Sequence, residues 1–285
     1  MTNDSRNRIA PQPNALSGRT ILMSGGSRGI GLAIAVAAAR AGANVALLAK
    51  TDTPHPTLAG TIHTAVEEIN AAGGQGLAIV GDVREDADVQ RAVDATIERF
   101  GSIDIVVNNA SAINLATTDQ LDMKRYDLMQ DINVRGTFLL SKTALPYLKA
   151  SDHGHILTLS PPLNLDPKWA GAHLGYTMAK YGMSMTTLGL AEELKNDGVG
   201  VNSLWPATLI DTAAIRNLPG GEQMVQGARS VDIVADAALA ILQSDPARVS
   251  GNFFTDEKVL ELNGVTDLSG YNLNPEIPLV EDIFL

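Results

Sequence analysis

The 285-residue chain contains no cysteine. This absence excludes disulfides, zinc–thiolate sites and thiol catalysis, and it gives no sign of an oxidising compartment. Long apolar runs are also missing, because no stretch without a charged residue exceeds 14 residues, whereas a membrane-spanning helix needs about 20 apolar residues. The net charge of −11 would repel the phosphate backbone of nucleic acids. We therefore expect a cytoplasmic protein without a membrane span or a nucleic-acid partner.

Metal-binding patterns are scarce as well. The five histidines offer one metal-like spacing, His153-x-His155, and no third ligand is apparent near it. Because a zinc site needs at least three protein ligands, no metal site is expected.

Short apolar runs alternate with helical patterns along most of the chain. Strands are expected at 20–24, 44–49, 77–80, 103–107, 156–159, 199–204 and 252–255. Helices are expected from 29 to about 41 and at 61–72, 87–100, 121–150, 174–196 and 235–243. This alternation is typical of βαβ units. It predicts an α/β fold with a mainly parallel, doubly wound, seven-stranded sheet and helices on both faces.

Composition changes at the two ends of the chain. Residues 1–17 are polar and contain Pro11 and Pro13, which predicts a disordered arm. Residues 18–285 are expected to form a single domain. From about residue 256 the chain becomes acidic and loop-rich, which indicates a C-terminal extension of that domain.

A glycine-rich segment follows the first expected strand and begins the first helix. Its sequence is Ser24-Gly25-Gly26-Ser27-Arg28-Gly29-Ile30-Gly31. Glycines at this position permit a tight turn and a close approach of backbone N–H groups to a pyrophosphate, at the positive end of a helix dipole. The alternative is a loop that serves only strand–helix packing. Its place between strand and helix favours dinucleotide binding.

The end of the second expected strand bears on cofactor choice. Sites that prefer NAD have an acid there, which binds the ribose 2′-hydroxyl, but this sequence has Lys50, and Arg28 lies in the glycine turn. Two cations in place of an acid predict a bound 2′-phosphate and therefore NADP(H). The alternative is that Lys50 is merely solvated at a strand end.

Tyr176 and Lys180 are four residues apart in an expected helix and therefore share one face. Lowering a tyrosine pKa from about 10 to about 7 requires about 4 kcal/mol, which an ammonium about 4 Å away could supply at an effective dielectric of about 20. The pair is a candidate general acid–base for interconverting a carbonyl and an alcohol. In isolation such a spacing is more often a surface pair.

Taken together, these residues resemble the short-chain dehydrogenase/reductase family from about residue 19 to residue 254. The matching motifs are Ser24-Gly-x-x-x-Gly-x-Gly31, Asp82-Val83, Asn108-Asn109-Ala110, Asn133 and Tyr176-x-x-x-Lys180. Further segments resemble one subgroup, the hydroxysteroid dehydrogenase-like proteins and their bacterial relatives. They are 49–51 with His55-Pro56, 108–112, 160–165, 179–185 and 251–254.

The resemblance implies a Rossmann-type fold and specific roles. Tyr176 would exchange a proton with the substrate oxygen, Lys180 would hold the nicotinamide ribose and lower the tyrosine pKa, and Asn133 would anchor a water. A further set would contact NADP(H), and its members are Ser24, Gly25, Ser27, Arg28, Gly29, Ile30, Gly31, Lys50, Asp82, Val83, Asn109, Ala110, Lys180 and Leu209.

The sequence departs from the family pattern in several places. Ser24 replaces a threonine, Ser111 replaces a glycine after Asn108-Asn109-Ala110, and Pro206-Ala207 replaces Pro-Gly. Where the family has a serine that polarises the carbonyl, spacing from the tyrosine gives Leu163 and alignment on the strand gives Pro161. The candidates for this role are Ser160 and Asn164.

These observations predict an NADP(H)-dependent oxidoreductase that acts by hydride transfer on a ketone, an aldehyde or an alcohol. An apolar substrate is expected from residues near the site, namely Leu163, Leu165, Trp169, Leu209, Ile215 and Leu218. The alternative is an NADP(H)-binding sensor or scaffold without turnover. By the resemblance, the helices near 121–150 and 174–196 would form a homodimer or homotetramer through Ala144, Met183, Met185 and Leu188.

Overall fold

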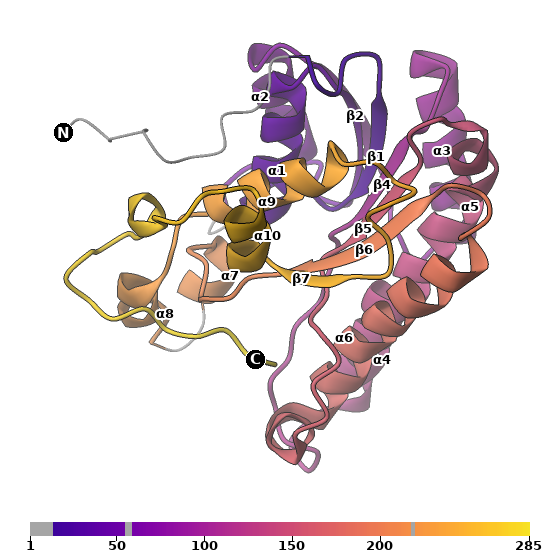
Figure 1. Cartoon of the computed structure of the whole chain (residues 1–285). Helices are drawn as coiled ribbons and strands as arrows, with labels where there is room; N and C mark the ends of the chain where they lie inside the picture. Colours follow the sequence, from indigo (N-terminus) through magenta and orange to yellow (C-terminus); the bar gives the residue numbers. More distant parts are fainter. Residues whose placement is uncertain (1–13, 55–58, 218–219) are drawn as a thin grey trace.

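A single seven-stranded sheet forms the centre of the molecule (Figure 1). The computed structural model describes residues 14–54, 59–217 and 220–285. The strand order is β3-β2-β1-β4-β5-β6-β7, and every neighbouring pair runs parallel. The predicted doubly wound sheet is confirmed. Because the chain moves outward in one direction from β1 and returns to β4 on its other side, a ligand crevice is expected where these strands end.

The elements agree with most of the expected ranges. The strands are β1 Thr20–Ser24, β2 Asn44–Ala49, β3 Gln75–Val80, β4 Ile105–Asn108, β5 His155–Thr158, β6 Gly200–Trp205 and β7 Phe253–Thr255. The helices are α1 Gly29–Arg40, α2 Ile62–Ala71, α3 Asp86–Phe100, α4 Met123–Met129, α5 Gly136–Ala150, α6 Pro167–Glu193, α7 Ala213–Arg216, α8 Gly221–Met224, α9 Asp232–Leu242 and α10 Asp256–Leu262.

Two of the expected helices differ in detail. The expected helix at 121–150 contains a π-helix at Gln130–Arg135 between α4 and α5. The helix expected from 174 already begins at Pro167, and His173 interrupts it with φ −158° and ψ 65°. Such interruptions of helical hydrogen bonding frequently occur at functional sites.

Helices cover both faces of the sheet. Residues of α1, α2 and α9 pack on one face and residues of α3, α5 and α6 on the other, in two large apolar clusters (Figure 1). No helix in the described part of the chain is long and apolar enough to cross a membrane.

The expected disorder of residues 1–17 is wrong for its last four residues. Residues 14–17 form a turn in which Leu16 is fully buried and its N–H donates to Ala41 O at 2.9 Å. The Leu16 side chain packs into the core together with residues of α1. The polar composition of the segment does not predict this contact. Residues 1–13 lie outside the described residues.

The segment after residue 256 joins the same fold. Helix α10 packs on α9, and the last residues then run back toward the carboxyl ends of the strands, where Leu209 N donates to Val280 O at 2.8 Å. The chain ends on the lower side of the molecule as drawn in Figure 1.

Two of the four residues expected at a subunit interface are unavailable to a partner. Ala144 and Met183 are fully buried within this chain, whereas Met185 and Leu188 are exposed. The expectation for Ala144 and Met183 is wrong because their helix faces point into the chain's own core.

Replacing Leu16 by alanine should destabilise the protein by about 2–5 kcal/mol, because a fully buried leucine leaves a cavity. Urea unfolding measures this change. Leu165→Ala is the matched control, since Leu165 is 83% exposed and should change stability by less than about 0.5 kcal/mol. A similarly small effect at Leu16 would contradict the packing of this turn.

Candidate active site

The carboxyl ends of four strands are aligned at one edge of the sheet. Ser24 pairs with Asn108, Asn108 with Thr158 and Thr158 with Ser203 across β1, β4, β5 and β6. The residues at and just after these strand ends therefore lie near this edge. They are the glycine turn, Asn109-Ala110, Leu159 and Trp205. Parallel sheets bind ligands in this position.

The glycine turn is shaped by close contacts that leave no room for a Cβ at Gly25, Gly26 or Gly31. Gly25, Gly26 and Gly29 have φ angles of 78°, 95° and 59°, which residues other than glycine rarely adopt. A Cβ on Gly31 would lie 2.8 Å from Gly26 Cα and closer still to the Asn109 amide. This backbone cradle at the beginning of α1 fits a dinucleotide pyrophosphate.

Ser24 and Arg28 secure the two ends of the turn. Ser24 Oγ accepts a hydrogen bond from Ala110 N at 3.2 Å, which joins the turn to the end of β4. Arg28 donates to Gly60 O at 3.0 Å and is half-buried. Among the other predicted residues, Ser27 is buried and Ile30 is half-buried against the α1–α9 core.

Lys50 and Asp82 form an ion pair at 3.0 Å where β2 and β3 end. Arg84 contacts the same carboxylate with its Nη2 at 2.7 Å from Asp82 Oδ2. Partial burial opposes ionisation of Asp82, but the hydrogen bonds from Arg84 and Lys50 outweigh it and hold the pKa of Asp82 well below its usual value. Val83, which follows Asp82, is buried.

Arg84 was not predicted as a site residue. In the sequence, Arg84 is marked only by its position two residues after Asp82. This spacing does not distinguish an arginine that points into solvent from one that contacts the aspartate. The structure thus brings two cations, Lys50 and Arg84, to one carboxylate near the expected ribose position.

Asn133 lies in the π-helix and is fully buried. Its Oδ1 accepts from Ala112 N at 2.8 Å and its Nδ2 donates to Ala112 O at 2.9 Å. Both ends of the amide therefore hold the loop after β4 against the helix. In this structure Asn133 holds that loop through both of its hydrogen bonds. The water that the resemblance implies at Asn133 stays a prediction.

Tyr176 and Lys180 lie one turn apart on α6, and both are buried, with Lys180 only 3% exposed. Lys180 Nζ donates to Leu159 O at 2.8 Å and lies 5.1 Å from the centre of the Trp205 ring. Burial lowers the pKa of Lys180 to about 7, against the opposing charge of Asp282. The predicted pair is thus brought to the carboxyl end of β5.

Tyr176 does not have the lowered pKa that the sequence argument expects. Burial raises its pKa above the usual range, the charge of Asp282 acts in the same direction, and a hydrogen bond with Ser111 opposes them. Desolvation is the largest of these effects, because Tyr176 is buried among apolar side chains that include Phe284. The phenol is therefore protonated at neutral pH in this arrangement.

The two candidates for polarising a carbonyl lie in different surroundings. Ser160 is fully buried, and its Oγ is 2.9 Å from Ser203 Oγ, which in turn donates to Thr187 Oγ1 at 2.8 Å. Asn164 Nδ2 donates to Phe284 O at 3.3 Å. Ser160 therefore belongs to a chain of buried hydroxyls, while Asn164 contacts the segment that covers Tyr176.

That covering segment was missed by the sequence argument. Phe284 is fully buried and its ring centre is 6.1 Å from that of Tyr176. Asp282 is half-buried and near enough for its charge to act on Lys180, and desolvation raises the pKa of this carboxyl to about 7. No local pattern could have indicated these contacts, because they join the end of the chain to a helix far away in the sequence.

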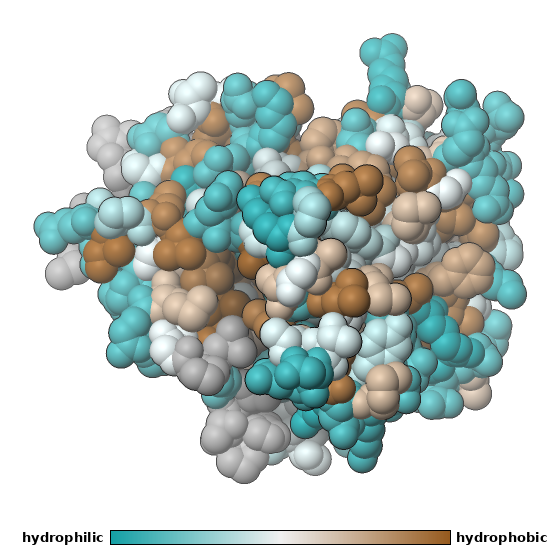
Figure 2. Space-filling view, turned by 90° about the horizontal axis from the view of Figure 1, so that it is seen from below, coloured by the Kyte–Doolittle hydropathy of each residue, from teal (hydrophilic) through white to brown (hydrophobic). Residues whose placement is uncertain are grey.

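The apolar residues expected near the substrate differ in burial and do not form one cluster. Trp169 packs against Phe284, and Leu209 is buried in a small cluster with Val225 and Ala228. Leu163 and Ile215 are half-buried, Leu165 is exposed, and Leu218 lies outside the described residues. Apolar patches appear between hydrophilic ones on the lower face of the molecule (Figure 2).

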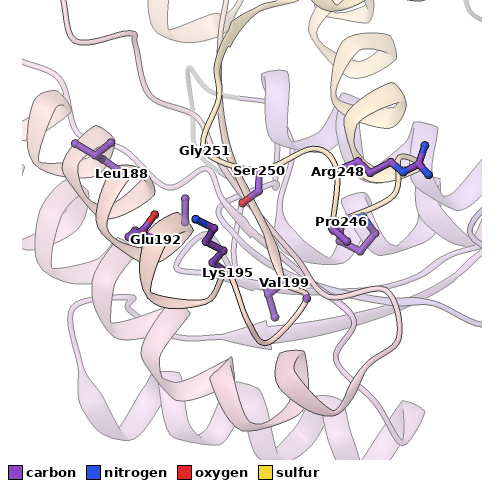
Figure 3. Close-up of a pocket in the computed structure, with 11 residues that line it drawn as sticks. Leu188, Glu192, Lys195, Val199, Pro246, Arg248, Ser250 and Gly251 are labelled. Atoms are coloured by element: carbon purple, nitrogen blue, oxygen red, sulfur yellow. The ribbon is translucent and has the colours of Figure 1, made fainter.

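A groove of about 330 Å³ lies elsewhere, between the end of α6 and the loop before β7 (Figure 3). Its walls include Leu188, Lys195 and Pro246, and it contains none of the predicted site residues. Because β6 begins beside it at Gly200, the groove is at the opposite edge of the sheet from Tyr176.

Comparisons with known proteins agree with this arrangement. The family model described as short chain dehydrogenase matches residues 19–222. Human hydroxysteroid dehydrogenase-like protein 2 is 50% identical over 97% of this chain and 66% of its own length. The chain spans about half to two thirds of the length of the curated relatives it matches.

Solved structures show the same fold. A short chain dehydrogenase from Mycobacterium thermoresistibile is 51% identical, with a TM-score of 0.90 over 95% of this chain and 96% of its own. Another from Burkholderia cenocepacia, solved in complex with NADP, is 28% identical, with a TM-score of 0.73 over 85% and 97%. The predicted resemblance to the family and to its subgroup is confirmed.

The buried Asp256 should make stability depend on pH. Its Oδ1 accepts from Ala207 N and Glu257 N, both at 2.8 Å, while burial raises its pKa from 3.8 to about 6. The folded state thus keeps this proton up to about pH 6, whereas the unfolded chain releases it near pH 4. Stability should therefore fall by about 3 kcal/mol from this group as pH rises from about 3 to about 7.

Asp256→Asn should remove this loss, so that the variant exceeds the wild type in stability at pH 8 and matches it at pH 4. Urea midpoints between pH 4 and 8 measure the difference. Glu261→Gln, at an exposed position of the same helix, serves as the control. A variant less stable than the wild type at pH 8 would contradict the prediction.

Proposed function

The chain belongs to the short chain dehydrogenase family, and from this premise we propose that it is an NADP(H)-dependent oxidoreductase. It interconverts a ketone or aldehyde and the corresponding alcohol on an apolar substrate. The observation that carries the proposal is the burial of Tyr176 and Lys180 at the carboxyl end of β5, beside a glycine cradle that has no room for a Cβ at Gly31.

NADP(H) supplies or accepts the hydride when it is bound. Tyr176 acts on the substrate oxygen, to which its protonated phenol donates in the reductive direction and from which it accepts in the oxidative one. Lys180, fixed by Leu159 O, holds the ribose of the nicotinamide. Asn133 holds the loop at Ala112 in place beside them.

The 2′-phosphate of NADP(H) is bound by the cations at the ends of β2 and β3. Lys50 is exposed for such a contact, and Arg84 shares its partner Asp82. Arg28, at the start of α1, is the third cation of this region. The NADP complex of the Burkholderia cenocepacia relative supports the same cofactor here.

We also propose that the protein assembles as a homodimer or homotetramer through the outer faces of α5 and α6. Phe138, Met185 and Leu188 are exposed there. Exposed apolar side chains of this size are the kind that subunit interfaces bury.

Tyr176→Phe should lower kcat by about 10²–10⁴-fold, because the hydroxyl that transfers the proton is lost. NADPH oxidation with a panel of ketones measures turnover, and NADPH binding should be unchanged. Tyr147→Phe, on α5, is the matched control and should keep its activity. Full turnover in Tyr176→Phe would reject the mechanism, and NADPH binding without turnover of any ketone by the wild type would favour a sensor.

NADPH should bind at least about tenfold more tightly than NADH, since each charge-assisted hydrogen bond to the 2′-phosphate contributes about 1.5–3 kcal/mol. Lys50→Ala should weaken NADPH binding and leave NADH binding nearly unchanged. Titration calorimetry gives both dissociation constants. Lys149→Ala, in an ion pair with Asp197, is the control, and equal constants for the two cofactors in the wild type would contradict the prediction.

A further inference from the structure

Phe284 occupies an aromatic cage beside the catalytic tyrosine. Four rings of α6 and one at the end of β6 surround it. The distances between ring centres are 5.8 Å to Trp169, 5.4 Å to His173, 6.1 Å to Tyr176, 5.3 Å to Tyr181 and 5.9 Å to Trp205. The kink at His173 lets one helix contribute four rings to a single cage.

The backbone around Phe284 is also held by polar groups of the site. Its carbonyl oxygen accepts from Asn164 Nδ2 at 3.3 Å, and the preceding carbonyl of Ile283 accepts from Trp205 Nε1 at 3.0 Å. An apolar ring in a cage and an adjacent carbonyl on an amide donor are the two features expected of a bound carbonyl substrate.

Two details indicate that Phe284 is not the best occupant of the cage. Its φ of 77° is unfavourable for a bulky residue, so contacts elsewhere must hold it. Trp169 Nε1 is buried without a hydrogen-bond partner among the described residues, although buried donors are nearly always satisfied. A ligand that carries an acceptor such as a carbonyl could satisfy this donor, which the hydrocarbon ring of Phe284 cannot do.

We propose that residues 283–285 act as an intramolecular ligand that fills the substrate site, and that the substrate displacing them is a carbonyl compound with a planar, aryl-sized apolar group. This inference rests on the proposed function. The five rings select a flat group, because aromatic pairs gain from edge and offset contacts that a saturated ring lacks. Asn164, freed from Phe284 O, then donates to the substrate carbonyl.

Only residues 283–285 are proposed to fill the substrate site, so the test variants can keep the chain up to residue 282. A chain ending at Asp282 keeps the hydrogen bonds of Val280 with Leu209 and Gly227 and that of Asp282 N with Ala207 O. Phe284→Ala is the point variant. Leu273→Ala removes an exposed leucine of the same C-terminal region and is the matched control.

The first measurement is steady-state kinetics with NADPH and three ketones, acetophenone, cyclohexyl methyl ketone and 2-butanone. Removing an internal competitor should lower the KM of all three by a common factor of about ten or more, because the open fraction scales apparent affinity. The truncated chain should also prefer acetophenone to cyclohexyl methyl ketone by at least about tenfold in kcat/KM, which corresponds to about 1.4 kcal/mol.

The second measurement needs no turnover. The two tryptophans of the chain, Trp169 and Trp205, both contact Phe284, so that loss of the tail should shift their emission. A synthetic peptide with the sequence of residues 280–285 should reverse the shift in the truncated chain and compete with acetophenone. The same peptide with alanine in place of phenylalanine should do neither.

Unchanged or higher KM values in Phe284→Ala and the truncated chain would overturn the proposal. Equal kcat/KM values for acetophenone and cyclohexyl methyl ketone would overturn the preference for an aryl group. If both variants unfold, amide hydrogen exchange of the wild type tests the proposal instead. The amides of residues 283–285 should exchange faster in the presence of saturating acetophenone and NADPH than in their absence. An unchanged exchange rate rejects the proposal. If no ketone is turned over, the proposed function fails, while the peptide titration still tests the tail.

Discussion

The burial of the Lys180 ammonium is the constraint on which the site depends. An ammonium removed from water must be satisfied by polar or aromatic partners, and here these come from three separate parts of the fold. Leu159 O lies at the end of β5, the Trp205 ring at the end of β6, and Asp282 on the last segment of the chain. Helix α6 is therefore tied to the edge of the sheet at the point where Tyr176 lies.

A second constraint is the close approach of the glycine turn to the end of β4. Gly31 and Gly25 contact Asn109 so closely that a Cβ at either position would clash with its amide. This contact fixes the cradle relative to the Asn109-Ala110 loop, and Asn133 fixes the same loop farther along through Ala112. The glycine turn and the π-helix at Gln130–Arg135 are thus connected by one short loop that is held at two points.

Charge is distributed in opposite ways at the two ends of this site. At β2 and β3, Asp82 keeps Lys50 and Arg84 together at a partly exposed surface, where cations remain available to a phosphate. At β5 and β6, buried Lys180 lies near the Trp205 ring and within reach of the charge of half-buried Asp282, and desolvation moves both pKa values to about 7. This division gives the candidate site one polar end and one apolar end.

Sequence alone determined the order of strands and helices, the glycine turn and the Tyr176–Lys180 pair. These features depend on residues close together in the chain, where hydrophobic period, positive φ and i, i+4 spacing act directly. Tertiary structure decided the surroundings of Ser160, the pairing of Lys50 with Asp82 and Arg84, and the burial of Leu16. It also decided that Phe284 packs against Tyr176 and that burial raises the pKa of Tyr176, because such contacts join segments whose separation in the sequence carries no periodic signal.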